Sequence, residues 1–355
     1  MILWLLREPV ALWVFGSATH MAEVGWLGLG VLLTLISGSQ TALLQGLRRI
    51  GDLARVQIIS GMFGAITGVI LVYALGQRGV VWFVLTTPAI SLLVAGYYAA
   101  RIQRPQPTHD WKAINQQWRL MFKLGLPFMA TGMLGLATQL AARSMTVNEL
   151  GLEAGGYFQA AWAISITYIG FVLGAMGADY YPRLSAAIHD HGAARIMVNE
   201  QTEMALLMAG PALLGMITFA PWVIQLLYSE SFASVNDVLR WQVLGGILKV
   251  ASWPMGYVLL AQGRGGIFIA LEQIWNAIYI GAIYLGMEGW GIDITGMGFV
   301  ISYAVYYGLI TFVVFKLIDL RLVLKHLLSV SFLLIAGGSI IFAFSQSWFG
   351  GYVTG

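Results

Sequence analysis

Two ionisable side chains, Lys249 and Glu272, lie inside helix-length apolar stretches of the sequence. The stretches read LGGILKVASWPMGYVLLAQG (244–263) and IFIALEQIWN (267–276). A lysine at the centre of a bilayer costs about 3 kcal/mol on insertion scales, so it is expected to face the protein interior or water. A cation fixed along a hydrated path can hold an anionic group through charge-assisted hydrogen bonds. The pattern therefore indicates a ligand-binding or ion-binding site within a membrane.

The helical neighbours of the two charges suit a hydrated cavity better than lipid. With a rise of about 1.5 Å per residue, Lys249 and Glu272 differ in depth by roughly 10 Å, which predicts separate partners unless tilt or side-chain reach closes the gap. Asn276 and Tyr279 share the helical face of Glu272. The face of Lys249 is polar, small or aromatic, and consists of Gln242, Gly245, Gly246 and Trp253. A buried structural ion pair is the alternative interpretation.

A third candidate is Arg143, near the outer end of another apolar stretch, with Gln139 one turn below. Arg143 is either a second cation of the site or a side chain that extends to the membrane surface. The sequence shows no set of catalytic residues, because the chain has no cysteine and no segment carries a Ser/His/Asp set or paired carboxylates. The motif His189-Asp190-His191 resembles a metal clip but falls in a polar loop. We therefore predict neither enzyme activity nor a metal or cofactor.

Composition places these residues in a polytopic membrane protein. The 355 residues are 59% hydrophobic and 10% charged, against about 25% charged in soluble domains. A crossing needs about 20 mainly apolar residues, and residues 1–16 resemble part of an eleventh span. The predicted fold is all-α, with ten to eleven transmembrane helices. The ten full candidates are 24–45, 56–75, 80–100, 123–143, 156–178, 204–228, 238–262, 266–287, 294–316 and 325–346.

The loops between these spans predict the orientation of the chain. Fourteen Lys and Arg residues lie in alternate loops on one side, and three, Arg7, Arg78 and Arg143, lie on the other. By the positive-inside rule the first side is cytoplasmic. Small residues four apart, at Gly61/Ala65, Gly64/Gly68 and Gly170/Gly174, predict closely packed helices.

A linker divides the chain. Residues 108–123, THDWKAINQQWRLMFK, carry apolar side chains at helical spacing and predict an amphipathic helix at the cytoplasmic interface. We expect a partial N-terminal transmembrane lobe (1–100), a cytoplasmic linker (101–122), a six-helix C-terminal lobe (123–316), and an additional helix with a tail (317–355).

Several stretches resemble one family of membrane carriers. WQVLGGILKVASWPMGYVLLAQGR (241–264) and FIALE (268–272) closely resemble the lipid-linked oligosaccharide flippases, or O-antigen (Wzx-type) translocases, of the multidrug/oligosaccharidyl-lipid/polysaccharide exporter superfamily. The resemblance covers nearly the whole chain. Three further regions agree, namely TALLQGLRRIGDLARVQIISG (41–61), LGLPFMATGML (124–134), and GGYFQAAWAIS with YYPRLS (155–165 and 180–185).

The resemblance implies an inner-membrane carrier with two pseudo-symmetric helical lobes around a central cavity. Such a carrier would move undecaprenyl-diphosphate-linked oligosaccharide from the cytoplasmic to the periplasmic leaflet by alternating access. Relative to the family the chain resembles an N-terminally truncated member, so the first lobe is expected to be incomplete. Some relatives also carry Gly-Asp three residues before the lysine, where this chain has Gly245-Gly246.

The resemblance also suggests roles for individual residues. Lys249 and Arg143 would hold the diphosphate, Trp253 would stack on sugar rings, and Glu272 would bind a coupling proton or sodium ion. The amides expected to meet sugar hydroxyls are Gln139, Gln159, Gln242 and Asn276. The expected partners are the lipid-linked oligosaccharide, membrane lipid, a polysaccharide polymerase and a chain-length regulator, and no nucleic acid.

Other functions are left open by the sequence. One is another exporter of the same superfamily, either a drug/cation antiporter, against which Lys249 argues, or a peptidoglycan-precursor flippase. Another is a polytopic enzyme of polysaccharide assembly, although such enzymes carry a large outer loop and the longest one here is 143–155. The third is a non-functional fragment.

Overall fold

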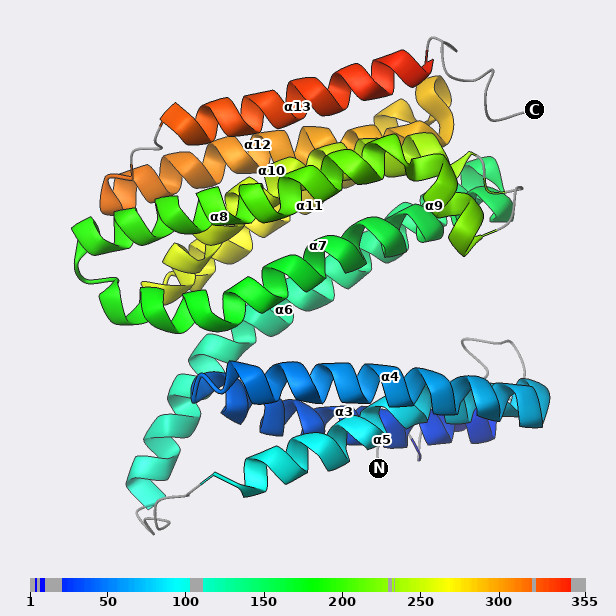
Figure 1. Ribbon diagram of the computed structural model, residues 1–355, viewed down its shortest axis with the longest axis vertical. Helices are drawn as coiled ribbons and strands as arrows, with labels where there is room; N and C mark the ends of the chain where they lie inside the picture. Colours follow the sequence, from blue (N-terminus) through cyan, green and yellow to red (C-terminus); the bar gives the residue numbers. More distant parts are fainter. Residues whose placement is uncertain are drawn as a thin grey trace. The chain divides into compact units, whose positions relative to one another are not determined.

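The computed structural model describes Trp4, residues 7–9, 21–102, 111–228, Phe232, 234–320 and 324–345. Within these residues every regular element is a helix (Figure 1). The chain packs as two compact units, Met1–His109 (unit 1) and Asp110–Gly355 (unit 2), which are described separately. Most of 1–16, the stretch predicted as part of an eleventh span, lies outside the described residues.

Unit 1 contains three long helices, α3 (Met21–Gly46), α4 (Ile50–Leu75) and α5 (Gly79–Ala100). The close approach of α4 to α5 depends on two glycines. A Cβ on Gly64 would lie 2.9 Å from the Thr87 Cα, and one on Gly68 would lie 2.2 Å from the Phe83 ring. The predicted close packing at this glycine pair is therefore confirmed. The other glycines predicted to do the same, Gly61, Gly170 and Gly174, have no described neighbour within 4 Å of a Cβ position.

Unit 2 is built around one central helix, α10 (Val235–Ala261). This helix is buried along most of its length and packs against α7, α8, α12 and α13. Because other helices cover most of its faces, apolar residues occur on every side of this helix, interrupted by polar ones such as Arg240, Gln242 and Lys249. The other helices of unit 2 are α6 (Trp111–Leu150), α7 (Leu152–Ala187), α8 (His191–Thr218), α9 (Ala220–Leu227), α11 (Gly265–Trp290), α12 (Ile294–Ile318) and α13 (Leu324–Ser345).

With one correction, each predicted span falls inside one of these helices to within one residue, and several helices extend well beyond the predicted span. The span predicted at 204–228 is not one helix, because α8 ends at Thr218 and α9 leaves it at an angle of 78°. The physical reason is Pro221, which has no N–H to donate to the carbonyl of Ile217 one turn earlier. Other prolines, such as Pro88, Pro211 and Pro254, lie inside uninterrupted helices.

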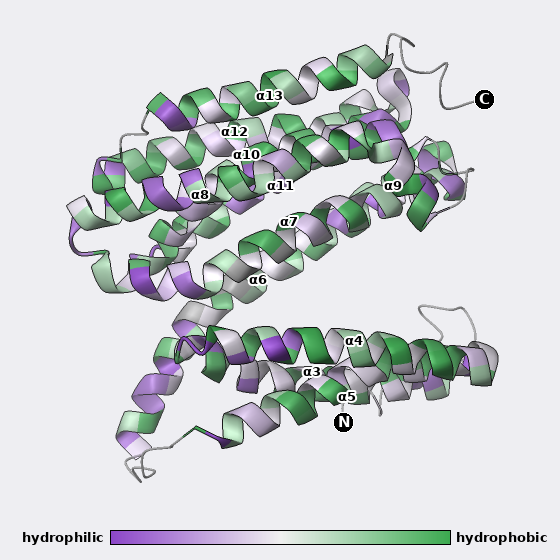
Figure 2. Cartoon of the chain, in the orientation of Figure 1, coloured by the Kyte–Doolittle hydropathy of each residue, from purple (hydrophilic) through white to green (hydrophobic). Residues whose placement is uncertain are grey.

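The helices define an all-α polytopic membrane protein, as predicted. Seven helical stretches of the described chain are long and apolar enough to cross a membrane, or eight if the bent pair α8–α9 is one span. Large apolar side chains are exposed along them, for example Leu140 at 70% and Leu285 at 81%. Exposure on this scale suits lipid rather than water, and Figure 2 shows hydrophobic residues along the helices of both units.

Helix α6 differs from the other long helices. It is not among the stretches that pass the apolarity test, and its membrane-length portion contains Thr138, Gln139 and Arg143. The amphipathic segment predicted over 108–123 is described from Trp111 onward, where it forms the first turns of the same 40-residue helix. Because that sequence has no proline or glycine before Gly125, nothing local ends the helix at the predicted linker boundary.

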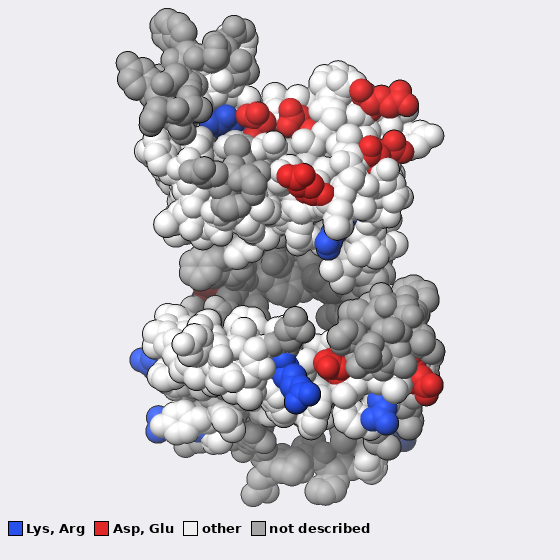
Figure 3. All heavy atoms as spheres, turned by 90° about the vertical axis from the view of Figure 1, so that its right-hand side faces the viewer, with Lys and Arg blue, Asp and Glu red and all other residues white. Residues whose placement is uncertain are grey.

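Charge is distributed unequally between the two ends of unit 2. At the end where α6 and α11 stop and α7 and α10 begin, the visible charges of unit 2 are mainly acidic (Figure 3). The acidic residues at these helix ends are Glu149, Glu153, Asp237, Glu288 and Asp293. Arg183, Arg195 and Lys316 lie at the opposite end, where Arg195 pairs with Asp319 at 3.2 Å. The predicted orientation depends on these Lys and Arg residues and not on the acidic ones, which also occur at this opposite end, for example Asp179 and Glu200.

Candidate functional site

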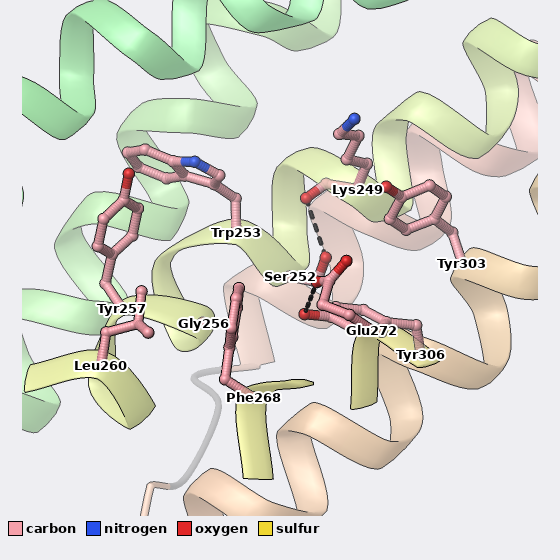
Figure 4. Close-up of a pocket in the computed structure, with 10 residues that line it drawn as sticks. All are labelled: Lys249, Ser252, Trp253, Gly256, Tyr257, Leu260, Phe268, Glu272, Tyr303 and Tyr306. Carbon is pink, nitrogen blue, oxygen red and sulfur yellow. Dashed lines mark hydrogen bonds between the residues drawn. The ribbon is translucent and has the colours of Figure 1, made fainter. Parts of the chain in front are cut away.

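Helices α10, α11 and α12 line a cavity of about 150 Å³ inside unit 2 (Figure 4). This volume is many times the space that one water molecule needs. The cavity brings together three of the residues predicted from the sequence, namely Lys249, Trp253 and Glu272. The described residues that line it are Lys249, Ser252, Trp253, Gly256, Tyr257, Leu260, Phe268, Glu272, Tyr303 and Tyr306.

Helical periodicity explains which side chains reach the cavity. The lining residues of α10 recur every three or four positions from Lys249 to Leu260, and so occupy one stripe of the helix. Phe268 and Glu272 are one turn apart on α11. Each of the three helices therefore presents a single stripe to the cavity and keeps its other faces for packing.

Within the described part of the chain, Lys249 contacts an aromatic ring and no carboxylate. Its Nζ lies 5.6 Å from the centroid of the Tyr303 ring on α12, within the range of a cation–π interaction. Among the described residues, no carboxylate oxygen lies within 4 Å of this amine. The flanking Leu248 and Val250 are buried in the helix bundle. The ammonium group is thus held at the cavity without a neutralising partner in contact.

Glu272 has its own partner, as the predicted depth difference suggested. The Tyr306 hydroxyl donates a hydrogen bond of 2.8 Å to its Oε1. Figure 4 shows this bond and draws the Lys249 amine pointing away from the carboxylate. The cavity therefore holds a cation and a carboxylate side by side in the same space, each with a different tyrosine of α12.

An aromatic wall continues from the cavity toward α7. The rings of Trp253 and Tyr257 meet edge to face at 4.8 Å, and Trp253 also lies 5.9 Å from Tyr180. Gly177 makes room for this group, because a Cβ there would lie 2.9 Å from Trp253 and 3.0 Å from the Tyr257 hydroxyl. Rings with a polar edge and an apolar face are suited to sugar-like groups, which also have both.

The other residues predicted for the site do not line this cavity. Gln242 is fully buried, and its Oε1 accepts a hydrogen bond of 3.0 Å from the Ser165 hydroxyl between α10 and α7. Asn276 is buried in α11. Arg143 is exposed on α6, and Gln139 and Gln159 are half-buried on α6 and α7.

Sequence reasoning missed the two tyrosines of α12. Tyr303 and Tyr306 lie three residues apart, and so on one helical face, within the apolar span predicted at 294–316. That spacing was a usable signal of a polar stripe. Their pairing with Lys249 and Glu272 could not be predicted, because it depends on the rotation of α12 against α10 and α11.

The described residues contain no group of three His, Asp or Glu side chains that could hold a metal ion. In the motif His189-Asp190-His191, the aspartate has a structural role. Its Oδ1 accepts hydrogen bonds from the backbone amides of Gly192 and Ala193 at the start of α8, which is the geometry of a helix N-cap.

Solved structures show which known fold the chain has. A solved structure described as the outward-facing conformation of a multidrug resistance MATE family transporter of the MOP superfamily superposes with a TM-score of 0.75 at 16% identity, covering 90% of this chain and 74% of that one. A second solved structure is a MOP superfamily transporter from Pyrococcus furiosus, described by a reverse polarity of its binding pocket. It superposes with a TM-score of 0.72 at 16% identity, covering 88% of this chain and 74% of that one. The chain has the fold of a MOP-superfamily transporter.

The sequence then defines the family. Residues 1–237 match the family described as polysaccharide biosynthesis protein. This is more than half of the chain, so the chain belongs to that family. It is 20% identical over 315 residues to the Lipid III flippase of Escherichia coli (strain K12), covering 86% of this chain and 73% of that protein. It is 26% identical over 204 residues to the EPS I polysaccharide export inner membrane protein EpsE of Ralstonia nicotianae, covering 54% of this chain and 45% of that protein.

Proposed function

We propose that this protein is an inner-membrane flippase for polysaccharide precursors. Its cargo would be an oligosaccharide linked through diphosphate to undecaprenol, of the O-antigen or a related polysaccharide, moved from the cytoplasmic to the periplasmic leaflet by alternating access. Family membership supports a role in polysaccharide biosynthesis, and the relatives are named as a flippase and an export protein.

The observation that carries the proposal is the environment of Lys249. Burying a lysine in the most buried helix of the unit costs free energy in a membrane. Its presence there therefore supports a functional role. Its amine lines a cavity that also contains Ser252 and Glu272, and no carboxylate is in contact with it among the described residues. A diphosphate could complete this site by supplying the missing negative charge through charge-assisted hydrogen bonds.

The other cavity groups suit the rest of such a cargo. Trp253 and Tyr257 would stack on sugar rings, and Glu272 would bind a proton or sodium ion or balance the charge of the empty cavity. The polyprenyl chain could stay in lipid beside the exposed apolar helix faces. Residues 1–100 and 123–316 would form the two lobes that move during alternating access, joined by the cytoplasmic linker 101–122.

The test is export in cells that lack their own flippase. We expect Lys249→Ala to reduce surface polysaccharide by about 30-fold or more, because truncating one partner of a buried charged contact costs at least about 2 kcal/mol. Lys316→Ala is the matched control, since Lys316 is an exposed lysine in the last turn of α12. Full export by Lys249→Ala at equal protein level would contradict the proposal.

A second arm separates the two precursor classes. The wild-type chain and the same variants are expressed in cells deficient in a peptidoglycan-precursor flippase. The proposal predicts that the wild-type chain does not restore growth of these cells. Rescue there, with no restoration of surface polysaccharide, would assign the protein to the other lipid-diphosphate substrate.

A further inference from the structure

We propose that Tyr306 is a positioning residue that holds the Glu272 carboxylate away from Lys249, and so keeps the lysine available for an anionic ligand. The inference rests on the proposed function for the identity of that ligand. Its starting point is that two opposite charges share one cavity without pairing.

The first step concerns the competition between ligands. A carboxylate and a phosphate oxygen seek the same donors, and inside a low-dielectric cavity a lysine and a glutamate attract each other far more strongly than in water. If Glu272 contacted Lys249, an incoming anion would have to displace it. The hydrogen bond from Tyr306 to Glu272 provides the carboxylate with an alternative partner at 2.8 Å.

The second step concerns the rigidity of that partner. Tyr306 is buried, with 6% of its surface exposed, and packs in the core formed by α10, α11 and α12. Its ring also meets Tyr303 edge to face at 6.0 Å. The Tyr306 phenol is therefore fixed by packing, and the Glu272 carboxylate takes the position that this hydroxyl sets.

The third step concerns the lysine. Tyr303 lies three residues before Tyr306, and its ring faces the Lys249 amine at 5.6 Å. An aromatic face attracts an ammonium group without neutralising its charge. One stripe of α12 thus stabilises both charges separately, and a shift of α12 would release both at once. Closure of Lys249 onto Glu272 after such a shift would help to expel the anionic cargo.

The experiment measures binding of farnesyl diphosphate, a short polyprenyl diphosphate, to the purified full-length protein in nanodiscs. The variants are Tyr306→Phe, Glu272→Gln and the double variant. We expect Tyr306→Phe to weaken binding about tenfold or more, as for the loss of a hydrogen bond to a charged group. We expect the double variant to bind within about twofold of Glu272→Gln, because the competing carboxylate is gone.

Tyr307→Phe is the matched control. Tyr307 lies next to Tyr306 on α12, and its buried hydroxyl has no hydrogen-bond partner among the described residues. Its loss should leave binding unchanged. Tyr306→Phe binding like the wild type would overturn the proposal. So would a double variant as weak as Tyr306→Phe, because the tyrosine would then act through packing and not through Glu272.

A second readout needs no substrate. The rate at which trinitrobenzenesulfonate labels Lys249 is followed by mass spectrometry, and an ion pair with Glu272 should slow it. We expect slower labelling in Tyr306→Phe and recovery in the double variant, even if farnesyl diphosphate does not bind. That combination would refute the proposed substrate and support the positioning role. If the wild type binds the diphosphate and Lys249 is labelled at the same rate in all variants, the proposed substrate would be supported and the positioning role of Tyr306 refuted.

Discussion

The Nε of Arg240 donates a hydrogen bond of 3.3 Å to the backbone carbonyl of Ile217. Pro221 lies four residues after Ile217 and cannot provide the usual helical donor, so the arginine side chain replaces it at the bend between α8 and α9. Arg240 also pairs with Asp237 at 3.1 Å and lies 3.9 Å from the centroid of the Phe344 ring of α13. Arg240 is therefore engaged by three groups of the protein itself.

Arg240 and Lys249 are both cations of the central helix α10, and their surroundings differ. The arginine is surrounded by a carbonyl, a carboxylate and a ring, whereas the lysine has a ring and an open cavity. This contrast distinguishes Arg240, a structural cation, from Lys249, for which we propose a ligand-binding role.

The first prediction concerns the structural cation. Arg240→Met should lower the stability of the purified protein by about 1–3 kcal/mol, because the Ile217 carbonyl is left buried without a donor. Thermal unfolding in detergent measures the loss. Arg183→Met, which removes an exposed pair with Asp179, should change little. An equal effect of the two substitutions would show that the bend does not depend on Arg240.

The second prediction concerns Lys249 and stability rather than transport. Lys249→Met should leave the thermal stability unchanged or raise it, because it removes an uncompensated buried charge and fills space with an apolar side chain. A drop of several kelvin would instead identify the lysine as part of a structural ion pair.

The third prediction concerns the sugar part of the cargo. Trp253→Ala should weaken binding of a lipid-linked oligosaccharide by about fivefold to tenfold, from an aromatic contact of about 1 kcal/mol. Binding of farnesyl diphosphate, which has no sugar, should change less than twofold. Calorimetry with both ligands checks this, and equal losses for both would remove the sugar-stacking role.

The fourth prediction concerns the packing of unit 1. Gly64→Ala should destabilise the protein by about 1–3 kcal/mol, because its Cβ would overlap Thr87. Gly61→Ala is the control, since nothing described lies near that position and alanine favours a helix by up to about 1 kcal/mol. Chemical or thermal unfolding of the two variants should therefore give effects of opposite sign.

Much of the fold could be predicted because long apolar stretches indicate most of the membrane-length helices, although α6 is less apolar than the others. Which glycines meet a neighbour could not, because this depends on how each helix is rotated in the bundle. The same limit applies to Pro221, which resembles Pro211 in the sequence although only Pro221 coincides with a break.

The site was predictable to a similar degree. Lys249 and Glu272 could be identified from the cost of burying a charge in apolar surroundings. Tyr306 could not be assigned to Glu272, because the two residues are 34 positions apart and their contact is tertiary. Arg240 was overlooked because it lies near the end of its span, where a cation is unremarkable in the sequence.

The most direct test of the account is translocation of a fluorescent polyprenyl-diphosphate oligosaccharide by the protein in proteoliposomes. We expect the wild type to move the label between leaflets, Lys249→Arg to retain part of the rate, and Lys249→Gln to fall to the rate of empty liposomes. A wild-type rate in Lys249→Gln would contradict the claim that this buried cation binds the diphosphate.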